Sequence, residues 1–280
     1  MSGKKDSLRR VPKSSDHKYI RGVVAVVAGS SRYPGAAVLT VGGARRGGAG
    51  YVKFFAKSGE LSKMVLQNFP DVAPIKSNFP DVAPIKSLIN EKIDALVVGP
   101  GAVSLRSLPM LIPVVLDGAA MSLAVKSKAK RLGKKDQGQI IVLTPHEGEL
   151  KKIGYQISQN SNERFTSTQI EKARKEVAQK IAEELQVIVV LKGNRTVIAA
   201  PGKKPIIDLI GGSELATAGS GDILAGLIGA FLASWKPENL DAAQKVVADA
   251  VKLHSKAGKH AKKSRSAVVA TDILESLAHC

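Results

Sequence analysis

The chain has 280 residues, of which 44% are hydrophobic and 4% aromatic. That is enough for one large α/β domain or two small ones, with a core built from aliphatic side chains. The single cysteine, Cys280, excludes an intramolecular disulfide and a zinc site made of cysteines. No apolar span has the length of a transmembrane helix or follows the N-terminus as in a signal peptide, so we expect a cytoplasmic protein without membrane contact.

Positive charge dominates the chain. Lysine and arginine number 42 against 24 aspartates and glutamates, a formal net charge of +18. A field of this sign attracts polyanions, including phosphorylated small molecules. Nucleic-acid binding is an alternative, but no helix-turn-helix and no aromatic RNA platform accompanies the basic tracts. A solubilising basic surface is the favoured interpretation.

Residues 1–20 are polar and basic and predict a flexible lead-in, and residues 21–280 predict a single domain. Near-continuous runs of Val, Ile and Leu are typical of parallel strands buried on both faces. Five such runs lie at residues 22–31, 93–101, 112–118, 140–149 and 187–194. The alternation of strands and helices predicts an α/β fold with a doubly wound, mainly parallel sheet.

Two further elements complete this pattern. Apolar residues recur at helical spacing up to Leu185, behind a capping box formed by Thr168 and Glu171. Residues 196–210 predict a hairpin around a Pro-Gly turn.

The decapeptide NFPDVAPIKS occurs twice without change, at residues 68–77 and 78–87. Two prolines in each copy exclude a regular helix there. A short period that occurs only twice is not a solenoid. We expect an inserted copy that loops out of the surface, because length alone penalises such an insertion weakly; a duplication within the sequence itself is the alternative.

Turn-forming and polar residues follow each of the five predicted strands. In open parallel sheets, ligands bind beyond the carboxyl ends of the strands. The residues at these ends are Gly29, Ser30 and Ser31, then Gly99, Pro100 and Gly101, then Asp117, then Thr144, Pro145 and His146, and finally Lys192 and Gly193. Five such ends in series predict an edge of the sheet at which a ligand can approach the backbone closely.

The segment from Gly219 to Asp222 directly precedes an apolar helical face. The first turn of a helix leaves amide N–H groups unpaired and carries partial positive charge. Glycines let those amides face an open site, so the segment predicts an anion hole suited to a phosphate. The Asp222 carboxylate is then either a helix cap or a base beside that phosphate.

Several motifs together resemble one family. The stretches TPHEGEL, VIVVLKGNRTVIAAPG and ELATAGSGDILAGLIGAFLA occur in this order and resemble the NAD(P)H-hydrate dehydratases of the ribokinase-like superfamily. The resemblance covers roughly residues 22–277, apart from the repeated decapeptide. It implies a three-layer α/β/α fold and an ADP- or ATP-dependent enzyme, a hydro-lyase, that repairs hydrated NADH and NADPH with Mg²⁺ as cofactor.

The resemblance also implies roles for individual residues. Asp222 would be the catalytic base that takes the proton of the substrate hydroxyl. The residues implied in nucleotide binding are Lys192, Gly193, Asn194, Arg195 and Thr196, with Gly219, Ser220 and Gly221. Those implied in contact with the hydrate are Ala36, Gly101, His146 and Asp222. No Mg²⁺ ligands are assigned.

Taken by themselves, several of these residues have other interpretations. His146 is equally a satisfied histidine at a strand end, and Lys192 an ordinary edge lysine. Glu147 and Glu149 are either metal ligands or an acidic first helical turn. A kinase of the same superfamily, acting on a small alcohol such as a vitamin precursor, would use the same anion hole and the same Asp222.

The chain departs from the family pattern in a few places. Ala218 replaces the first of two glycines, and no further glycine follows Gly101 closely, which weakens the implied substrate contact there. Many relatives carry an N-terminal epimerase domain. Because the first predicted strand begins near Gly22, we expect the epimerase to be a separate polypeptide. Relatives are commonly tetrameric, so a homo-oligomer is expected.

Overall fold

A nine-stranded sheet forms the centre of the part of the chain that the computed structural model describes, which is residues 8–56, 58–75, 92–101, 105, 107–108, 112–132, 139–158 and 173–280. The strand order is β3-β2-β1-β4-β5-β6-β7-β8-β9. The pairings from β3 to β7 are parallel, and those of β7 with β8 and β8 with β9 are antiparallel. The strands are β1 (Val23–Val27), β2 (Tyr51–Phe55), β3 (Ala73–Pro74), β4 (Ala95–Val98), β5 (Val114–Leu116), β6 (Ile141–Leu143), β7 (Ile188–Leu191), β8 (Val197–Ala199) and β9 (Ile206–Ile207).

All five strands expected from the sequence are present. They are β1, β4, β5, β6 and β7, and they lie side by side in this order, all parallel. The expected hairpin is confirmed as β8 and β9. β2 was not expected, because Lys53 interrupts its short apolar run. In the sheet this lysine is nevertheless buried, at 9% exposure.

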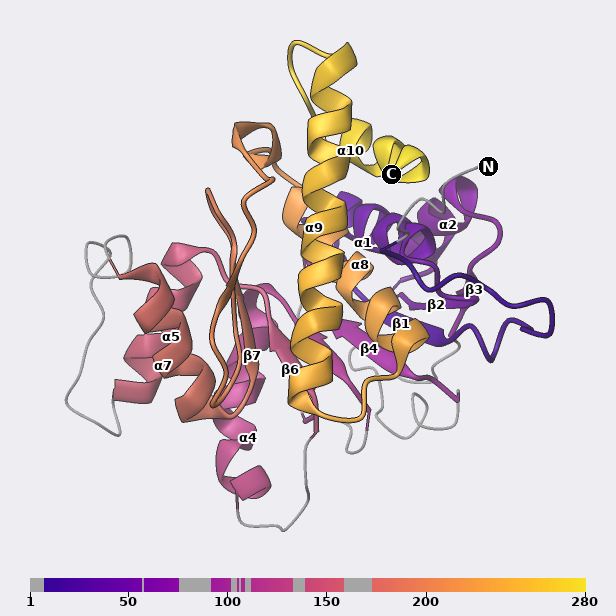
Figure 1. Ribbon diagram of the computed structural model, residues 1–280. Helices are drawn as coiled ribbons and strands as arrows, with labels where there is room; N and C mark the ends of the chain where they lie inside the picture. The colour runs from indigo at the N-terminus through magenta and orange to yellow at the C-terminus, as the bar shows by residue number, and fades with distance from the viewer. Residues whose placement is uncertain are drawn as a thin grey trace.

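Helices cover both faces of this sheet (Figure 1). Alternate residues of β1 pack into two different cores, with Val24 and Val26 on one face and Val23 and Val27 on the other. The first core is completed by α1 (Pro34–Arg46), α2 (Gly59–Asn68), α8 (Ser220–Trp235), α9 (Leu240–Ser264) and α10 (Ala270–Ser276). The second is completed by α4 (Ser122–Leu132), α5 (Glu147–Ser158) and α7 (Arg174–Leu185). The expected three-layer α/β/α architecture is therefore confirmed.

Three short 3-10 turns complete the described elements, η1 (Gly118–Met121), η2 (Ser213–Leu215) and η3 (Leu277–His279). None of the helices in the described ranges is long and apolar enough to cross a membrane.

The first copy of the repeated decapeptide is not a surface loop. Its Ala73–Pro74 forms β3, which extends the sheet beside β2, and Val72 and Ile75 on either side are buried. Pro74 is compatible with this position because β3 is an edge strand, and Pro70 lies in the turn before it. The second copy, residues 78–87, lies outside the described residues, as does the capping box of Thr168 and Glu171. Among the described residues α7 begins at Arg174.

The part of the lead-in that is described contacts the domain. Arg9 donates hydrogen bonds to the carbonyl oxygens of Arg46 at 2.7 Å, Leu277 at 2.5 Å and Cys280 at 2.6 Å. This side chain therefore connects the start of the chain to the end of α1 and to the C-terminus. The division at residue 20 stays a prediction.

Two helices of the first layer, α1 and α8, touch through their backbones. A Cβ built on Gly43 would lie 2.2 Å from the carbonyl oxygen of Ile223, and one built on Gly226 would lie 2.0 Å from that of Thr40. No side chain fits between the helices at these points. The contact fixes the N-terminal half of α8 relative to the sheet.

The substitution Gly43→Ala should therefore destabilise the protein by about 1–3 kcal/mol, because overpacking forces the two helices apart. Gly35→Ala is the matched control in the same helix, since no atom lies within 4 Å of a Cβ built there. Denaturant unfolding of both variants measures the difference. Equal stability of the two variants would contradict the close contact.

Candidate active site

The carboxyl ends of the five central strands are linked to one another by backbone hydrogen bonds. From β4 to β7, the residue that follows each strand donates its N–H to a carbonyl at the end of the preceding strand in the sheet order. The bonds are Gly99 N to Val27 O at 3.1 Å, Asp117 N to Val98 O at 3.0 Å, Thr144 N to Leu116 O at 3.1 Å and Lys192 N to Pro145 O at 2.8 Å. The expected functional edge of the sheet is thus one continuous backbone framework.

The first turn of α8 lies at this edge. Its N-cap, Gly219, has φ +90°, a conformation that glycine adopts without strain, and it offers no side-chain cap. The amides at the start of the helix therefore have no side-chain acceptor at the N-cap position. Asp222 is in this first turn, at the positive end of the helix dipole.

Lys192 joins the sheet edge to this helix. Its Nζ lies 2.9 Å from Oδ1 of Asp117 and 3.9 Å from Oε2 of Glu149. The same Asp117 oxygen accepts a hydrogen bond of 2.5 Å from Oγ1 of Thr144. A Cβ built on Gly221 would lie 3.1 Å from the lysine Nζ. The ammonium group is thus held between a buried carboxylate and the first turn of α8.

The surroundings of Asp222 change its acidity. Burial raises the pKa of its carboxyl group from the ordinary 3.8 to about 7, with further increases from the negative charges of Asp117 and Glu149 and an opposing effect of the Lys192 ammonium. A carboxylate with a pKa near neutrality is suited to accept a proton at neutral pH. A helix cap alone would not require this environment.

A cavity of about 570 Å³ is lined by Lys192 of this cluster, but not by Asp117, Glu149 or Asp222. Of the residues predicted from the sequence, it is lined by His146, Lys192, Gly193, Asn194, Thr196, Ser220 and Gly221. Its remaining walls come from Gly212, Ser213, Leu215, Ala216, Thr217, Leu224 and His254. The structure therefore brings the segment after β7 and the start of α8 together around one space, as the motifs indicated.

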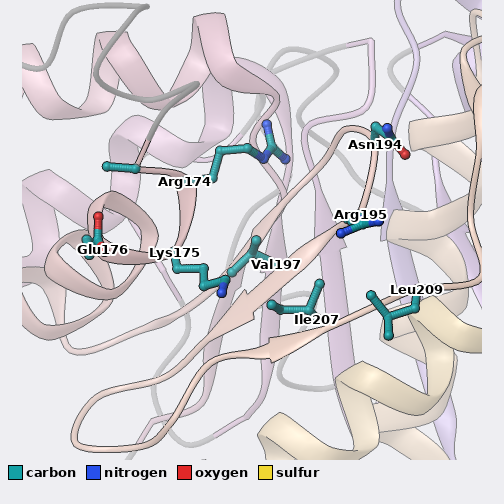
Figure 2. A pocket seen from close by; sticks show the side chains of 9 residues that line it. Arg174, Lys175, Glu176, Asn194, Arg195, Val197, Ile207 and Leu209 are labelled. Atoms are coloured by element: carbon teal, nitrogen blue, oxygen red, sulfur yellow. The ribbon is translucent and has the colours of Figure 1, made fainter.

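Arg195 is placed differently. It does not line the larger cavity but a separate one of about 340 Å³, together with residues at the start of α7 (Figure 2). Asn194 lines both cavities. Arg195 has φ +61°, so the turn between β7 and β8 passes through the left-handed region at this residue.

Ala36 and Gly101 lie against each other rather than in the larger cavity. A Cβ built on Gly101, which has φ +66°, would lie 2.7 Å from Cβ of Ala36 and 3.0 Å from Cβ of Tyr33. Gly29 N donates to Pro100 O at 2.7 Å and holds the two turns together. These residues form a separate contact at the ends of β1 and β4.

His146 both begins a helix and faces solvent. Its Nδ1 accepts hydrogen bonds from Gly148 N at 3.0 Å and Glu149 N at 3.3 Å, at the start of α5. Its backbone N–H donates to Oε2 of Glu149 at 2.9 Å. The side chain is 61% exposed. Nδ1 serves the helix, and Nε2 lies 3.5 Å from Oε2 of Glu149.

The sequence interpretation missed His254. This residue of α9 is buried, lines the larger cavity and lies with Nε2 3.2 Å from Oγ of Ser220. Burial lowers the pKa of its imidazole to about 4, so the ring is neutral at physiological pH. A lone histidine on a long helix carries no motif, and only the packing of α9 on α8 reveals its position.

Mg²⁺ has no protein cage among the described residues, where no cluster of three or more metal-binding side chains occurs. Magnesium that enters with nucleotide phosphates needs only one or two carboxylates from the protein. Each carboxylate near Lys192 has another role, because Asp117 is bonded by Lys192 and Thr144, Oε2 of Glu149 accepts the backbone N–H of His146, and Asp222 is the candidate base. No Mg²⁺ ligand is therefore assigned.

The sheet order and the two helical layers define the ribokinase-like fold. A ribokinase-like superfamily protein from Enterococcus faecalis superposes with a TM-score of 0.72 over 97% of this chain and 90% of that one, at 22% identity. The Bacillus subtilis ADP/ATP-dependent NAD(P)H-hydrate dehydratase, co-crystallised with ATP/Mg²⁺, gives a TM-score of 0.71 at 25% identity and covers 96% and 92% of the two chains.

The family follows from sequence comparison. The model of the NAD(P)H-hydrate dehydratase family matches residues 24–279, and the chain belongs to this family. The ADP-dependent (S)-NAD(P)H-hydrate dehydratase of Lactococcus lactis is 30% identical over 87% of this chain and 83% of its own length. The bifunctional NAD(P)H-hydrate repair enzyme of Corynebacterium glutamicum is 36% identical over 78% of this chain. The chain matches 37% of the length of that bifunctional relative.

The raised pKa of Asp222 predicts a pH-dependent effect of Asp222→Asn on stability. Between pH about 4 and about 7 the folded chain binds more protons at this residue than the unfolded chain, so wild-type stability falls as pH rises. Asparagine cannot ionise. The free energy of unfolding of the variant should therefore increase relative to that of the wild type as pH rises to about 7. Above that pH the difference should stay constant. Each unit of the pKa shift contributes about 1.4 kcal/mol to the difference.

Thermal unfolding of both proteins across this pH range measures the difference. Asp241→Asn is the control, because Asp241 occupies the first turn of another helix, α9, and its pKa is lowered by neighbouring lysines. A difference between Asp222→Asn and wild type that does not change with pH would contradict the pKa assignment.

Proposed function

We propose that this protein is an ADP- or ATP-dependent (S)-NAD(P)H-hydrate dehydratase. The observation that carries the proposal is the position of Asp222, a carboxylate with a pKa near 7 at the start of α8, beside Lys192 and next to a cavity that Lys192 and Gly221 line. Family membership and the activity for which the Lactococcus lactis relative is named support the substrate assignment.

The chemistry follows from the poor leaving ability of hydroxide. In the proposed reaction the hydroxyl oxygen of the hydrate attacks the terminal phosphoryl group of ADP or ATP, and Asp222 takes its proton. AMP or ADP leaves. Phosphate then leaves from the resulting ester as the nicotinamide ring nitrogen donates electrons, and loss of a proton from the neighbouring ring carbon gives NAD(P)H.

The protein stabilises negative charge during phosphoryl transfer. The amides at Gly219, Ser220 and Gly221 and the Lys192 ammonium would lie around the transferred group. Mg²⁺, bound with the phosphates, would supply further positive charge. The His254 imidazole, neutral and against Ser220, supports the start of the helix.

The proposal keeps the remaining site assignments. The nucleotide would contact Lys192, Gly193, Asn194, Arg195 and Thr196, of which all but Arg195 line the larger cavity. The hydrate would contact Ala36, Gly101, His146 and Asp222. The contact between Ala36 and Gly101 and the exposure of the His146 side chain support this division.

The wider expectations belong to the same proposal. They are a cytoplasmic location, assembly into a homotetramer, and an NAD(P)H-hydrate epimerase as the functional partner, with NADH hydrate and NADPH hydrate as substrates. The epimerase partnership is supported by the relatives that are named bifunctional NAD(P)H-hydrate repair enzymes.

Asp222→Asn should abolish turnover while nucleotide binding persists. Loss of a general base lowers the rate by about 10²–10⁴-fold. The assay supplies NADH hydrate, Mg²⁺ and either ADP or ATP and follows the return of NADH absorbance. Asp241→Asn should keep wild-type turnover, because Asp241 lies in the first turn of α9.

Absence of NADH recovery with both nucleotides would refute the proposed activity. A phosphorylated alcohol without elimination would instead indicate a superfamily kinase. Tight, salt-sensitive polynucleotide binding that survives Asp222→Asn would support the nucleic-acid alternative.

The rate should also depend on pH in a definite direction. Asp222 accepts a proton only when ionised, so kcat/KM should fall as pH drops below about 7. The charged groups around it are Asp117, Glu149 and Lys192. Glu149→Gln removes a negative charge and should shift this fall to lower pH. A rate that stays constant between pH 5 and 8 would contradict the role of Asp222.

A further inference from the structure

Arg174, the first residue of α7, is bonded to two separate loops of the site. One guanidinium nitrogen, Nη2, donates to the carbonyl oxygens of Leu191 at 3.3 Å and Lys192 at 3.1 Å. The other, Nη1, pairs with the carboxylate of Glu147 at the start of α5. The side chain is 16% exposed. Sequence patterns did not single out this residue.

The peptide around Lys192 is therefore held from two sides. Its N–H donates to Pro145 O at 2.8 Å, in the turn that leads to His146, and its carbonyl accepts from Arg174. Glu147, the carboxylate partner of Arg174, directly follows His146. One guanidinium thus connects the end of β7 to the turn after β6.

The next residue, Gly193, packs directly on the guanidinium. It has φ +142°, and a Cβ built on it would lie 2.8 Å from Nη2 of Arg174. Even a methyl group would displace the arginine or the loop. The direction in which the chain leaves β7, and with it the cavity wall formed by Gly193 and Asn194, depends on this contact.

Arg174 acts from outside the larger cavity. It lines the smaller cavity on the other side of the loop, where Figure 2 shows it with Lys175 and Glu176 at the start of α7, across from Asn194 and Arg195. It is absent from the residues that line the larger cavity. Any effect on a ligand there must pass through the loop.

We propose that Arg174 is a positioning residue of the nucleotide site, which holds the backbone of Leu191–Lys192 and joins it to the turn that carries His146. The identity of the ligand rests on the proposed function. Lys192 Nζ can reach Asp117 at 2.9 Å only if its backbone is held in this place. The planar guanidinium group of arginine bonds two carbonyls and a carboxylate at once, and the single ammonium group of lysine cannot reproduce this geometry.

The test compares Arg174→Lys and Arg174→Gln with Lys175→Gln. Lys175 is the adjacent, exposed residue of the same helix, so its substitution removes the same charge but none of the bonds that Arg174 makes to Leu191, Lys192 and Glu147. Calorimetry with ADP or ATP and Mg²⁺ measures the dissociation constant, and thermal unfolding confirms that each variant is folded. Both Arg174 variants should bind nucleotide about tenfold more weakly, which corresponds to about 1.4 kcal/mol. Lys175→Gln should bind as the wild type does.

Steady-state kinetics separate positioning from a merely structural role. A displaced loop should raise the KM for nucleotide about tenfold and change kcat much less. A smaller fraction of folded protein would lower the apparent kcat and leave KM unchanged. Arg174→Lys keeps the charge, so its failure to restore binding would assign the effect to the hydrogen-bond geometry.

The outcomes distinguish this inference from the proposed function. If the wild type binds nucleotide and both folded Arg174 variants bind equally well, the positioning role is overturned and the dehydratase proposal stands. Equal weakening in Lys175→Gln would also overturn it, because general charge would then explain the effect. A wild-type chain that binds neither nucleotide overturns both proposals.

Discussion

The ion pair between Lys192 and Asp117 is the interaction on which the site depends. Asp117 is 6% exposed, so its charge needs a partner, and Lys192 and Thr144 both bond the same carboxylate oxygen. The pair joins the end of β7 to the end of β5 across β6. It also places an ammonium group beside Gly221 in the first turn of α8, where an anion would meet both the lysine and the helix amides.

The two residues of this pair also affect the pKa of Asp222, in opposite directions. Two carboxylates and one ammonium surround this residue in a partly buried position, and burial has the largest effect on its pKa. The position itself depends on the glycine contacts between α1 and α8, which set how far the first turn of α8 projects over the sheet edge. Backbone packing at Ile223, the residue next to Asp222, therefore contributes to the electrostatics of the site.

The loops that follow β6 and β7, at the same edge of the sheet, form the other half of the site. His146 begins α5, and the segment from Lys192 to Thr196 leads into the β8–β9 hairpin. Backbone bonds at Lys192 and the guanidinium of Arg174 connect them. Ligands bound on either loop would share one rigid support, which suits a reaction between two substrates because their reacting atoms must meet in a fixed geometry.

The sequence alone determined the five central strands, the hairpin and the residues at the strand ends, because buried parallel strands need continuous aliphatic runs and turns need glycine, proline or a polar residue. It did not reveal β2, which contains Lys53, or β3, which contains Pro74, or the burial of His254. Only the tertiary structure decided which polar groups meet. Asp117, Lys192 and Asp222 are far apart in the chain, and their mutual effect on charge depends on distance and burial, which no local pattern encodes.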